Sequence, residues 1–450
     1  MTYIPISPKE RDAMLATVGV KKLDDLFNDI PAKHRFPKLD LPPALTEMEA
    51  AASLAELAGS NDTTRDLVSF LGAGAYNHYI PAAVDHILRR GEFYTAYTPY
   101  QPEISQGTLQ AIFEYQSLIA TLTGMDVSNA SHYDGATAVA EAVNMAYAQF
   151  RGKRTKVVIS PTVHPQYRAT LRTYSQGMGL TLAGDDPSAD LISNLDSLTS
   201  SIDDNTALVI VQYPDFFGRI YDYTKLIEAA HGKGALVCIA ANPIALALLK
   251  TPGEMGADIA VGEGQPLGIP LAFGGPYLGF FTARKQYLHK MAGRLVGETV
   301  DSRGQRAFVL TLTAREQHIK RERATSNICT NQGLMALASA VYLSLLGQRG
   351  LRQVAELCYH KAHYAAEQIA KIPGYSLCFD TPFFHEFSVC CPRPVEEINA
   401  HLLDHGILGG YDLGQNYPAL KDHMLLAVTE MNSKEEIDYL ADVLAEVSHD

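Results

Sequence analysis

Tyrosine side chains are concentrated in a proline-rich segment of the sequence, GEFYTAYTPYQPEISQG, from Gly91 to Gly107. The prolines make a continuous helix unfavourable there. Aromatic rings that end in a hydroxyl suit the wall of a binding pocket, because they exclude water and still offer directed hydrogen bonds. A surface loop whose tyrosines anchor it to the core is the alternative interpretation.

A run of small residues opens a predicted helix in SHYDGATAVAE, from Ser131 to Glu141. Gly135, Ala136 and Thr137 leave backbone N–H groups accessible at the positive end of the helix dipole. Such a turn can bind an anion, although the same residues also serve as an ordinary helix N-cap. The sequence leaves both interpretations open at this point.

Two further polar turns follow predicted regular structure. VQYPDFFGR, from Val211 to Arg219, ends a predicted strand with Tyr-Pro-Asp, where open α/β sheets place ligand-facing loops. TAREQHIKRERATSNICTNQ, from Thr313 to Gln332, joins a basic helical patch to a turn of short polar side chains. A solvated helix face, with Glu316 and Lys320 paired across one turn, explains the basic patch. It does not explain the polar turn at 325–330, which is therefore a second candidate binding segment.

These segments lie among alternating predicted strands and helices. Nearly continuous apolar strands separated by helices indicate a mostly parallel sheet covered on both faces. We expect a doubly wound α/β domain at residues 65–330. Its predicted strands are 156–160, 207–212, 236–240, 259–262 and 277–282, with helices at 108–121, 136–149, 165–175 and 223–231.

The segments on either side of this domain predict two further parts. Residues 1–64 carry two helical patterns around a proline-rich stretch, and Thr46 with Glu49 predicts a capping box at the second. We expect an arm that packs on a partner subunit or on its own domain. From residue 331, two helices joined at 347–350 lead into alternating strands and helices, a pattern that predicts a small C-terminal α+β domain at residues 331–450.

The composition is typical of a globular protein and argues against several classes. Apolar residues make up 47% and charged residues 19% of the chain, and the formal net charge of -13 disfavours nucleic acid or an anionic membrane as a partner. The spacing of the cysteines fits neither a disulfide framework nor a zinc module, so we expect reduced thiols and no metal site. Neither a secretory nor a transit pattern opens the sequence, and apolar runs such as Leu334–Leu346 are too short to span a bilayer. A cytoplasmic location is expected.

Six segments, taken in order, resemble the glycine cleavage system P-protein family and cover nearly the whole chain. The resemblance implies the fold-type I architecture of transferases that depend on pyridoxal phosphate (PLP), with a large sheet domain and a small C-terminal domain. It also implies two related halves, which some organisms fuse and others keep as separate subunits. The segments are YTPYQPEISQG (97–107), SHYDGATAVAEA (131–142), QYP (212–214), PGEMGADIAVGEGQPLGIPLAFGGP (252–276), GRLVG (293–297) and TAREQHIKRERATSNICTNQ (313–332).

The cofactor turn of such folds normally carries a lysine that holds PLP as a Schiff base, but Thr251–Arg284 contains no lysine. When PLAFGGP (270–276) is aligned with the proline and glycine run in the lysine-bearing half of the P-protein family, Gln265 falls at the position of the lysine. The strand that should end in an aspartate for the pyridine nitrogen reads LVCIAANPIAL (236–246), without a carboxylate. The resemblance thus implies that this chain carries no PLP and keeps a vestigial cofactor pocket, with His164, Gly135 and Thr137 as its remnants.

The resemblance implies an enzyme subunit, the N-terminal and lysine-free half of a two-subunit P-protein, which is active only with a PLP-bearing partner subunit. Together the two subunits would decarboxylate glycine, release CO2 and pass the aminomethyl group to the lipoyl group of H-protein. The lipoyl disulfide would be the oxidant. An α2β2 heterotetramer is implied as the assembly.

Within that assembly, we expect this chain to line the shared site and part of the lipoyl channel through polar side chains on two facing turns: Tyr94, Tyr97, Tyr100, Gln101, Ser105, Gln106, Thr325, Ser326 and Asn327. Two alternatives stay open. One is a purely structural subunit that touches no substrate. The other is an independent PLP enzyme that uses a different lysine, such as Lys250 or Lys285.

Overall fold

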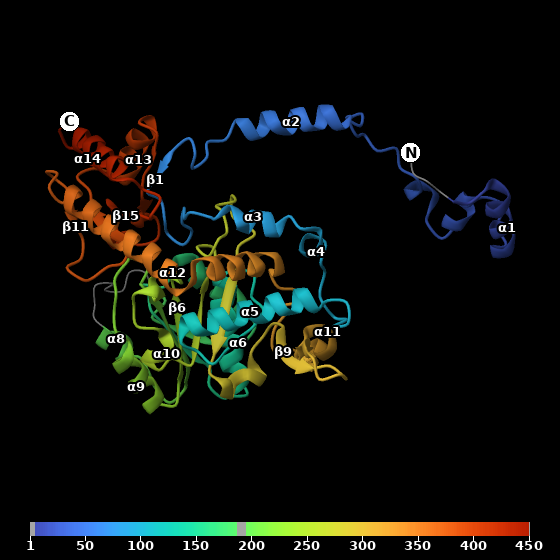
Figure 1. The fold of residues 1–450 in the computed structure, drawn as a ribbon, viewed down its shortest axis with the longest axis horizontal. Coiled ribbons are helices and arrows are strands. Elements are labelled where there is room, and N and C mark those ends of the chain that lie inside the picture. Colours follow the sequence, from blue (N-terminus) through green and yellow to red (C-terminus); the bar gives the residue numbers. More distant parts are fainter. Residues whose placement is uncertain (1–4, 187–194, 450) are drawn as a thin grey trace. The chain divides into compact units, whose positions relative to one another are not determined.

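The computed structural model describes residues 5–186 and 195–449. The chain separates into two units, Met1–Asp62, here named the arm unit, and Thr63–Asp450, named the main unit. Figure 1 shows the elements of both units, coloured along the sequence.

The arm unit consists of short helices with a very small core. Its elements are α1 (Pro8–Val18), the 3-10 turns η1 (Leu23–Phe27) and η2 (Ala32–His34), and α2 (Glu47–Gly59). The Glu49 N–H donates to the Thr46 hydroxyl and the Thr46 N–H donates to the Glu49 carboxylate, so the predicted capping box is confirmed. Among the arm's described residues, Leu15 is the one buried side chain.

A seven-stranded sheet forms the centre of the main unit, in the order β2-β8-β7-β6-β5-β3-β4. Its strands are parallel except for β8, which runs antiparallel to both of its neighbours. The predicted α/β fold with a mostly parallel sheet is therefore confirmed. The strands are β2 (Val127–Ser128), β3 (Lys156–Ile159), β4 (Thr181–Ala183), β5 (Thr206–Tyr213), β6 (Leu236–Ala241), β7 (Ile259–Glu263) and β8 (Gly279–Ala283).

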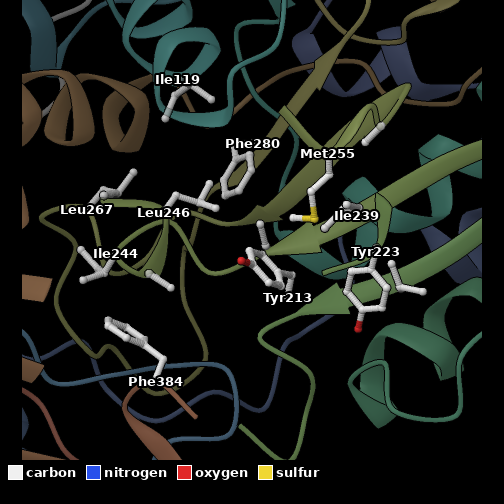
Figure 2. Close-up of a cluster of buried hydrophobic side chains, with 14 of the residues drawn as sticks. Ile119, Tyr213, Tyr223, Ile239, Ile244, Leu246, Met255, Leu267, Phe280 and Phe384 are labelled. Carbon is white, nitrogen blue, oxygen red and sulfur yellow. The ribbon is translucent and has the colours of Figure 1, made fainter. Parts of the chain in front are cut away.

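Helices cover both faces of this sheet, because successive strand residues point to opposite sides. Ile239 of β6 packs with α5, α9 and α12 in one apolar cluster, whereas its neighbour Cys238 packs with α6 and α7 in another. Figure 2 shows the first cluster, where Phe280 and Tyr213 converge with aliphatic side chains from neighbouring elements. The helices of this region are α3 (Ala82–Leu88), α4 (Gly91–Tyr94), α5 (Gln106–Thr123), α6 (Gly135–Gln149), α7 (Pro165–Ser175), α8 (Leu195–Ser200), α9 (Thr224–Gly232), α10 (Pro252–Met255) and α12 (Gly333–Ile369), with 3-10 turns η3 (Ala245–Ala247) and η4 (Lys285–Lys290).

An antiparallel hairpin of β9 (Leu295–Val300) and β10 (Arg306–Thr311), which the sequence patterns did not reveal, packs on α5. The Gln116 side chain of α5 donates to the Val296 carbonyl and accepts from the Val296 N–H, which fixes the hairpin to the helix. After the hairpin come three single turns in place of the predicted basic helical patch. They are η5 (Thr313–Arg315), α11 (Gln317–Lys320) and η6 (Arg321–Arg323).

The expected pairing of Glu316 with Lys320 is wrong. The Lys320 N–H donates to the Glu316 carbonyl, but Glu316 is the N-cap of α11 with an extended backbone, at φ -61° and ψ 144°, and its side chain does not pair with Lys320. The Glu316 carboxylate instead lies 3.7 Å from the guanidinium of Arg294.

Helix α12 extends from the large sheet to the C-terminal region and breaks at Gly347, whose φ of 58° and ψ of -174° suit glycine. The predicted junction at 347–350 coincides with this break. Ala338 packs in the cluster on the large sheet, and Ile369 packs in the C-terminal cluster. Among the described helices, α12 alone is long and apolar enough to cross a membrane, and 44% of its most apolar stretch is buried within the protein.

A four-stranded antiparallel sheet, ordered β11-β12-β15-β14, forms the C-terminal region. Strand β1 (Val68–Ser69) pairs in parallel with β13 (Ile407–Leu408), so the residues just after the arm unit lie beside C-terminal strands. The division of the main unit at residue 331 stays a prediction. The remaining elements are β11 (Ser376–Leu377), β12 (Glu386–Cys390), β14 (Tyr411–Asp412), β15 (His423–Ala427), α13 (Val395–Asp404), α14 (Lys434–His449), η7 (Leu413–Gln415) and η8 (Pro418–Leu420).

Candidate functional site

A small cavity of about 40 Å³ lies at the carboxyl ends of β5, β6 and β7, the edge at which open α/β sheets bind ligands. Tyr76 from the N-terminal side and Glu386 from β12 help to close it. The volume has room for only a few water molecules. Pockets that bind organic ligands usually enclose roughly 300 Å³ or more, so this one is largely filled by the protein itself.

Gln265, the residue predicted at the lysine position, directly precedes Pro266 of the cavity lining and is only 1% exposed. Its side-chain oxygen accepts from the Tyr76 N–H at 2.9 Å. Its amide nitrogen donates to the carbonyls of Tyr76, at 2.9 Å, and Ile269, at 2.8 Å. The side chain is therefore a fully bonded crosslink between the turn after β7 and the segment around Tyr76.

Carboxylates of the chain occupy the N-terminus of α6, where the sequence suggested an anion site. The Asp134 carboxylate accepts from the Thr137 N–H at 2.7 Å, and the Glu263 carboxylate accepts from the Gly135 N–H at 3.0 Å. A Cβ on residue 135 would lie 2.3 Å from the Tyr167 hydroxyl oxygen, so the glycine permits this close packing. The helix N-cap interpretation accounts for these residues.

Two carboxyl groups lie beside the small cavity, those of the buried Glu386 and the half-buried Glu263. The Glu263 carboxylate also accepts from the N–H groups of Gln265 and Leu278, while Glu386 accepts from the Ala73 N–H and the Tyr76 hydroxyl. Burial raises the pKa of each carboxyl group to about 7, and these hydrogen bonds oppose the rise. Neither residue was identified from the sequence, because a single glutamate at a strand end is not a distinctive pattern.

His164 caps α7 and has no free ring nitrogen. Its Nδ1 accepts from the Gln166 N–H at 3.1 Å, so Nε2 carries the proton and donates to the Ala73 carbonyl at 2.7 Å. Tyr167 stacks on the imidazole at 4.8 Å between ring centroids, and Phe216 packs edge-on. Burial lowers the pKa of His164 to about 4, which keeps the ring neutral.

The residues of this pocket do not fit PLP. The predicted lysine position holds a bonded amide in place of an amine, and carboxylates of the chain cover the N-terminus of α6, the predicted anion site. Asn242, which follows β6, directs its side-chain oxygen to the N–H groups of its own turn, at Ile244 and Ala245. Neither alternative lysine lines the cavity, and Lys250 donates to Asp222 and Thr224.

A second cavity, of about 300 Å³, opens beside the tyrosine-rich segment. Tyr94 and Tyr97 line it and remain 70% and 81% exposed. Ile112 and Leu337 contribute apolar walls from α5 and α12, and Asn331 contributes a polar edge. The structure thus places the tyrosine-rich segment (91–107) beside residues that follow the polar turn at 325–330. The cavity between them is large enough for an organic group.

Arg294 connects the two candidate segments. Its guanidinium donates to the Tyr100 hydroxyl at 3.2 Å and lies 5.5 Å from the centre of the Tyr100 ring. The Tyr100 hydroxyl in turn donates to the Glu316 carboxylate at 3.3 Å. Arg294 lines the larger cavity and a neighbouring one of about 30 Å³. Arg294 belongs to the segment GRLVG, whose sequence indicates no role for it.

The other predicted site residues are dispersed around these cavities. Gln106 does not line the larger one, because its amide pairs with the backbone of Phe308 in β10. Gln101 is exposed and Ser105 half-buried at the start of α5, and neither lines the larger cavity. Thr325 and Ser326 line the cavity of about 30 Å³, whereas the exposed Asn327 lines neither.

Glu141 lies on α6 beneath the polar turn and is 1% exposed. Neither of its carboxylate oxygens has a hydrogen-bond partner of good geometry. Burial raises the pKa of Glu141 to about 7, and the nearby side chains of Ser326 and Asn144 oppose that rise. The sequence gave no sign of its burial, because glutamate usually occupies the exposed face of a helix.

The sequence model of one family, described as "Glycine cleavage system P-protein", matches residues 1–444. The chain belongs to this family. P-protein relatives named "Probable glycine dehydrogenase (decarboxylating) subunit 1" are 54% identical in Thermomicrobium roseum, over 100% of both chains, and 52% identical in Geobacillus kaustophilus, over 99% of this chain and 98% of that one.

Solved structures agree with the P-protein assignment. A crystal structure of glycine decarboxylase (P-protein) of the glycine cleavage system, in inhibitor-bound form, aligns with a TM-score of 0.90 and 42% identity, over 99% of this chain and 100% of that one. Glutamate decarboxylase from Lactobacillus brevis aligns with a TM-score of 0.68 at 15% identity. The latter match shows the fold alone, which is the PLP fold-type I architecture predicted from the sequence.

Proposed function

We propose that this chain is the cofactor-free subunit of a two-subunit glycine dehydrogenase (decarboxylating) of the glycine cleavage system. The bonded amide of Gln265 at the lysine position is the observation that carries the proposal. A subunit-1 relative of equal length supports it, because that name describes one part of a larger enzyme. The partner is then a second subunit that holds PLP.

In this assembly the PLP of the partner subunit supplies the electron sink that decarboxylation of glycine requires. CO2 is released, and the aminomethyl group passes to the lipoyl group of H-protein as its disulfide is reduced. No step uses a cofactor on this chain. We further propose an α2β2 heterotetramer in the cytoplasm.

The contribution of this chain is the wall of the shared site. The larger cavity combines apolar side chains such as Ile112 and Leu337 with the exposed rings of Tyr94 and Tyr97. Such a surface excludes water and accepts a long apolar group, and exposed aromatic residues are frequent in protein interfaces. The lipoyl arm of H-protein is the substrate group with this character, so we place it here, with the partner subunit covering the tyrosines.

Phe273 is a second contact that the proposal assigns to the partner. The ring is 89% exposed in the glycine-rich turn after β7, and the residue adopts a positive φ of 49°. A bulky residue in the left-handed region is costly unless the surroundings require it. Contact with a partner subunit would bury this ring.

Reconstitution tests the proposal directly. The full chain, a PLP-bearing P-protein subunit 2 and lipoylated H-protein are assayed singly and together for exchange of CO2 with the carboxyl group of glycine. We expect exchange only when all three are present, with PLP recovered on subunit 2. Exchange by this chain with H-protein alone, or by subunit 2 without this chain, would refute the division of roles.

Replacing single side chains distinguishes a site-lining subunit from a scaffold. We expect Tyr97→Phe to lower turnover of the reconstituted enzyme by up to about tenfold, the effect of one hydrogen bond lost in the transition state. Ser105→Ala should also lower turnover. We expect a smaller factor than for Tyr97→Phe, because Ser105 lies outside the wall of the larger cavity. Both variants should assemble with the partner, as judged by size-exclusion chromatography.

Tyr359→Phe on α12 is the matched control and should leave turnover unchanged, since Tyr359 is an exposed tyrosine that lines neither cavity. Normal turnover in the Tyr97 and Ser105 variants would favour the purely structural subunit.

A further inference from the structure

Three potential metal ligands meet at one edge of the C-terminal sheet. Cys390 at the end of β12 lies directly opposite His423 at the start of β15 and opposite Ser376 of β11. The Cys378 N–H donates to the Ser388 carbonyl at 3.0 Å, which places Cys378 opposite Ser388. Side chains two positions apart on a strand share a face, so Cys378 and Cys390 project from the same side of the sheet.

The side chains converge as well as the backbone. The sulfur atoms of Cys378 and Cys390 are 3.1 Å apart. Both sulfurs and an imidazole nitrogen of His423 lie within 4.8 Å of one another, and all three residues are half-buried. A pair of thiols with an imidazole is the ligand set typical of Zn²⁺ and related borderline or soft cations.

A backbone carbonyl fixes the tautomer of His423. Its Nδ1 lies 2.7 Å from the Lys421 carbonyl, and a carbonyl can only accept, so Nδ1 carries the proton. The lone pair is then on Nε2. Histidines that bind metals are commonly held in this way, with the second ring nitrogen donating to a backbone carbonyl.

Acidic residues lie next to the cluster in the fold. Asp422 precedes His423 in the chain, and Asp412 lies opposite Met424, the residue after His423. Nearby carboxylates are compatible with a bound cation.

We propose that Cys378, Cys390 and His423 form a binding site for a divalent cation of the zinc class, with a fourth position open to water. Binding forms two sulfur–metal bonds and one nitrogen–metal bond, and the two thiols release their protons. The sulfurs must separate slightly, since Zn–S bonds of about 2.3 Å in a tetrahedral site hold them further apart than 3.1 Å. A disulfide between the cysteines is the competing state, but it gives no role to His423.

Cation binding is measured on the full chain after treatment with a chelator and a reductant. With Co²⁺ as the probe, we expect one equivalent to produce the near-ultraviolet thiolate charge-transfer band, and Zn²⁺ to remove the band by displacement. On the wild-type chain, bound Zn²⁺ should protect Cys378 and Cys390 from alkylation, as mapped by peptide mass spectrometry. This protection assay depends on no variant folding correctly.

Single substitutions then test each ligand. Cys378→Ser, Cys390→Ser and His423→Gln should each weaken Zn²⁺ binding roughly tenfold or more. Cys329→Ser, at an exposed cysteine elsewhere, and His405→Gln, in a separate His401–His405–Glu446 cluster, are the controls and should leave the charge-transfer band unchanged. Three results would each overturn the proposal. They are absence of the charge-transfer band, equal alkylation of the cysteines with and without Zn²⁺, and detection of a disulfide between Cys378 and Cys390 as the only state of the pair.

Discussion

Gln265 binds the backbone with both ends of its amide. The oxygen and nitrogen together make three hydrogen bonds, of which two go to Tyr76, 189 residues away in the sequence. The same segment is held from the other side, where the Tyr76 hydroxyl donates to Glu386. The segment around Tyr76 is therefore fixed over the turn after β7 from two sides.

Replacing Gln265 by lysine should not create a PLP enzyme. We expect Gln265→Lys to lower the free energy of unfolding by about 2 kcal/mol or more, because the Tyr76 N–H loses its acceptor in a buried place. Incubation with PLP, reduction with borohydride and mass spectrometry should find no pyridoxyl group at residue 265. Gln110→Lys, on the exposed face of α5, should change stability by no more than about 0.5 kcal/mol. A stable variant labelled at residue 265 would show that the pocket still accepts the cofactor.

Glu141 should make stability depend on pH. Its folded pKa of about 7 lies above the ordinary value of 4.5, so between these values the folded chain binds more protons than the unfolded chain. The contribution of Glu141 to stability is therefore complete below about pH 4.5 and is lost as the pH rises through 7.

We expect Glu141→Gln to remove part of this dependence. From pH 5 to pH 8, the free energy of unfolding of the variant should fall by about 2 kcal/mol less than that of the wild-type chain. Urea denaturation at several pH values measures the difference. Glu114→Gln, at an exposed glutamate of α5, should follow the wild-type curve. If the Glu141 variant also followed that curve, the carboxyl group would have an ordinary pKa in the folded chain.

At the scale of elements, the break in α12 lets one helix serve two packed regions. Its first part packs on the large sheet, and its last turns pack on the C-terminal sheet, with Gly347 between them. A Cβ at this glycine would meet no atom within 4 Å. The cost of a larger residue is therefore conformational and not steric crowding.

We expect Gly347→Ala to lower the free energy of unfolding by about 1–3 kcal/mol, since residues with a Cβ rarely adopt its backbone angles. Thermal unfolding followed by circular dichroism measures the effect. Gly232→Ala in α9 is the control, because its Cβ also meets nothing within 4 Å and its φ is not positive. That substitution should be neutral or slightly stabilising. Equal stability in both variants would mean that α12 can straighten at no cost.

For the whole molecule, the sequence patterns predicted the parts that local periodicity determines. The apolar runs of β5 and β6 indicate strands buried on both faces, and the structure has them there. The hairpin of β9 and β10 was not predicted, because residues 306–311 alternate too weakly to indicate a strand and the pairing depends on α5.

The candidate site was predicted in part for a similar reason. Tyr94 and Tyr97 line a cavity, and their cluster of tyrosines is visible in the sequence itself; their binding role stays a prediction. The roles of Arg294 and Glu263 depend on contacts between segments that are far apart in the sequence. The spacing of residues along the chain does not reveal such contacts. Strand register likewise brings Cys378, Cys390 and His423 together, although their spacing led us to expect no metal site.

The crosslink from Gln265 to Tyr76 also has an evolutionary consequence. Glutamine and lysine codons differ by a single base, so mutation can readily place an amine at this position. Such a change would meet a backbone segment already closed over the site, with Glu263 and Asp134 bonded to the N-terminus of α6. Each of these contacts would have to be undone before an amine became useful. In the proposed two-subunit enzyme, a single mutation at this position would therefore not be enough to give this chain a cofactor of its own.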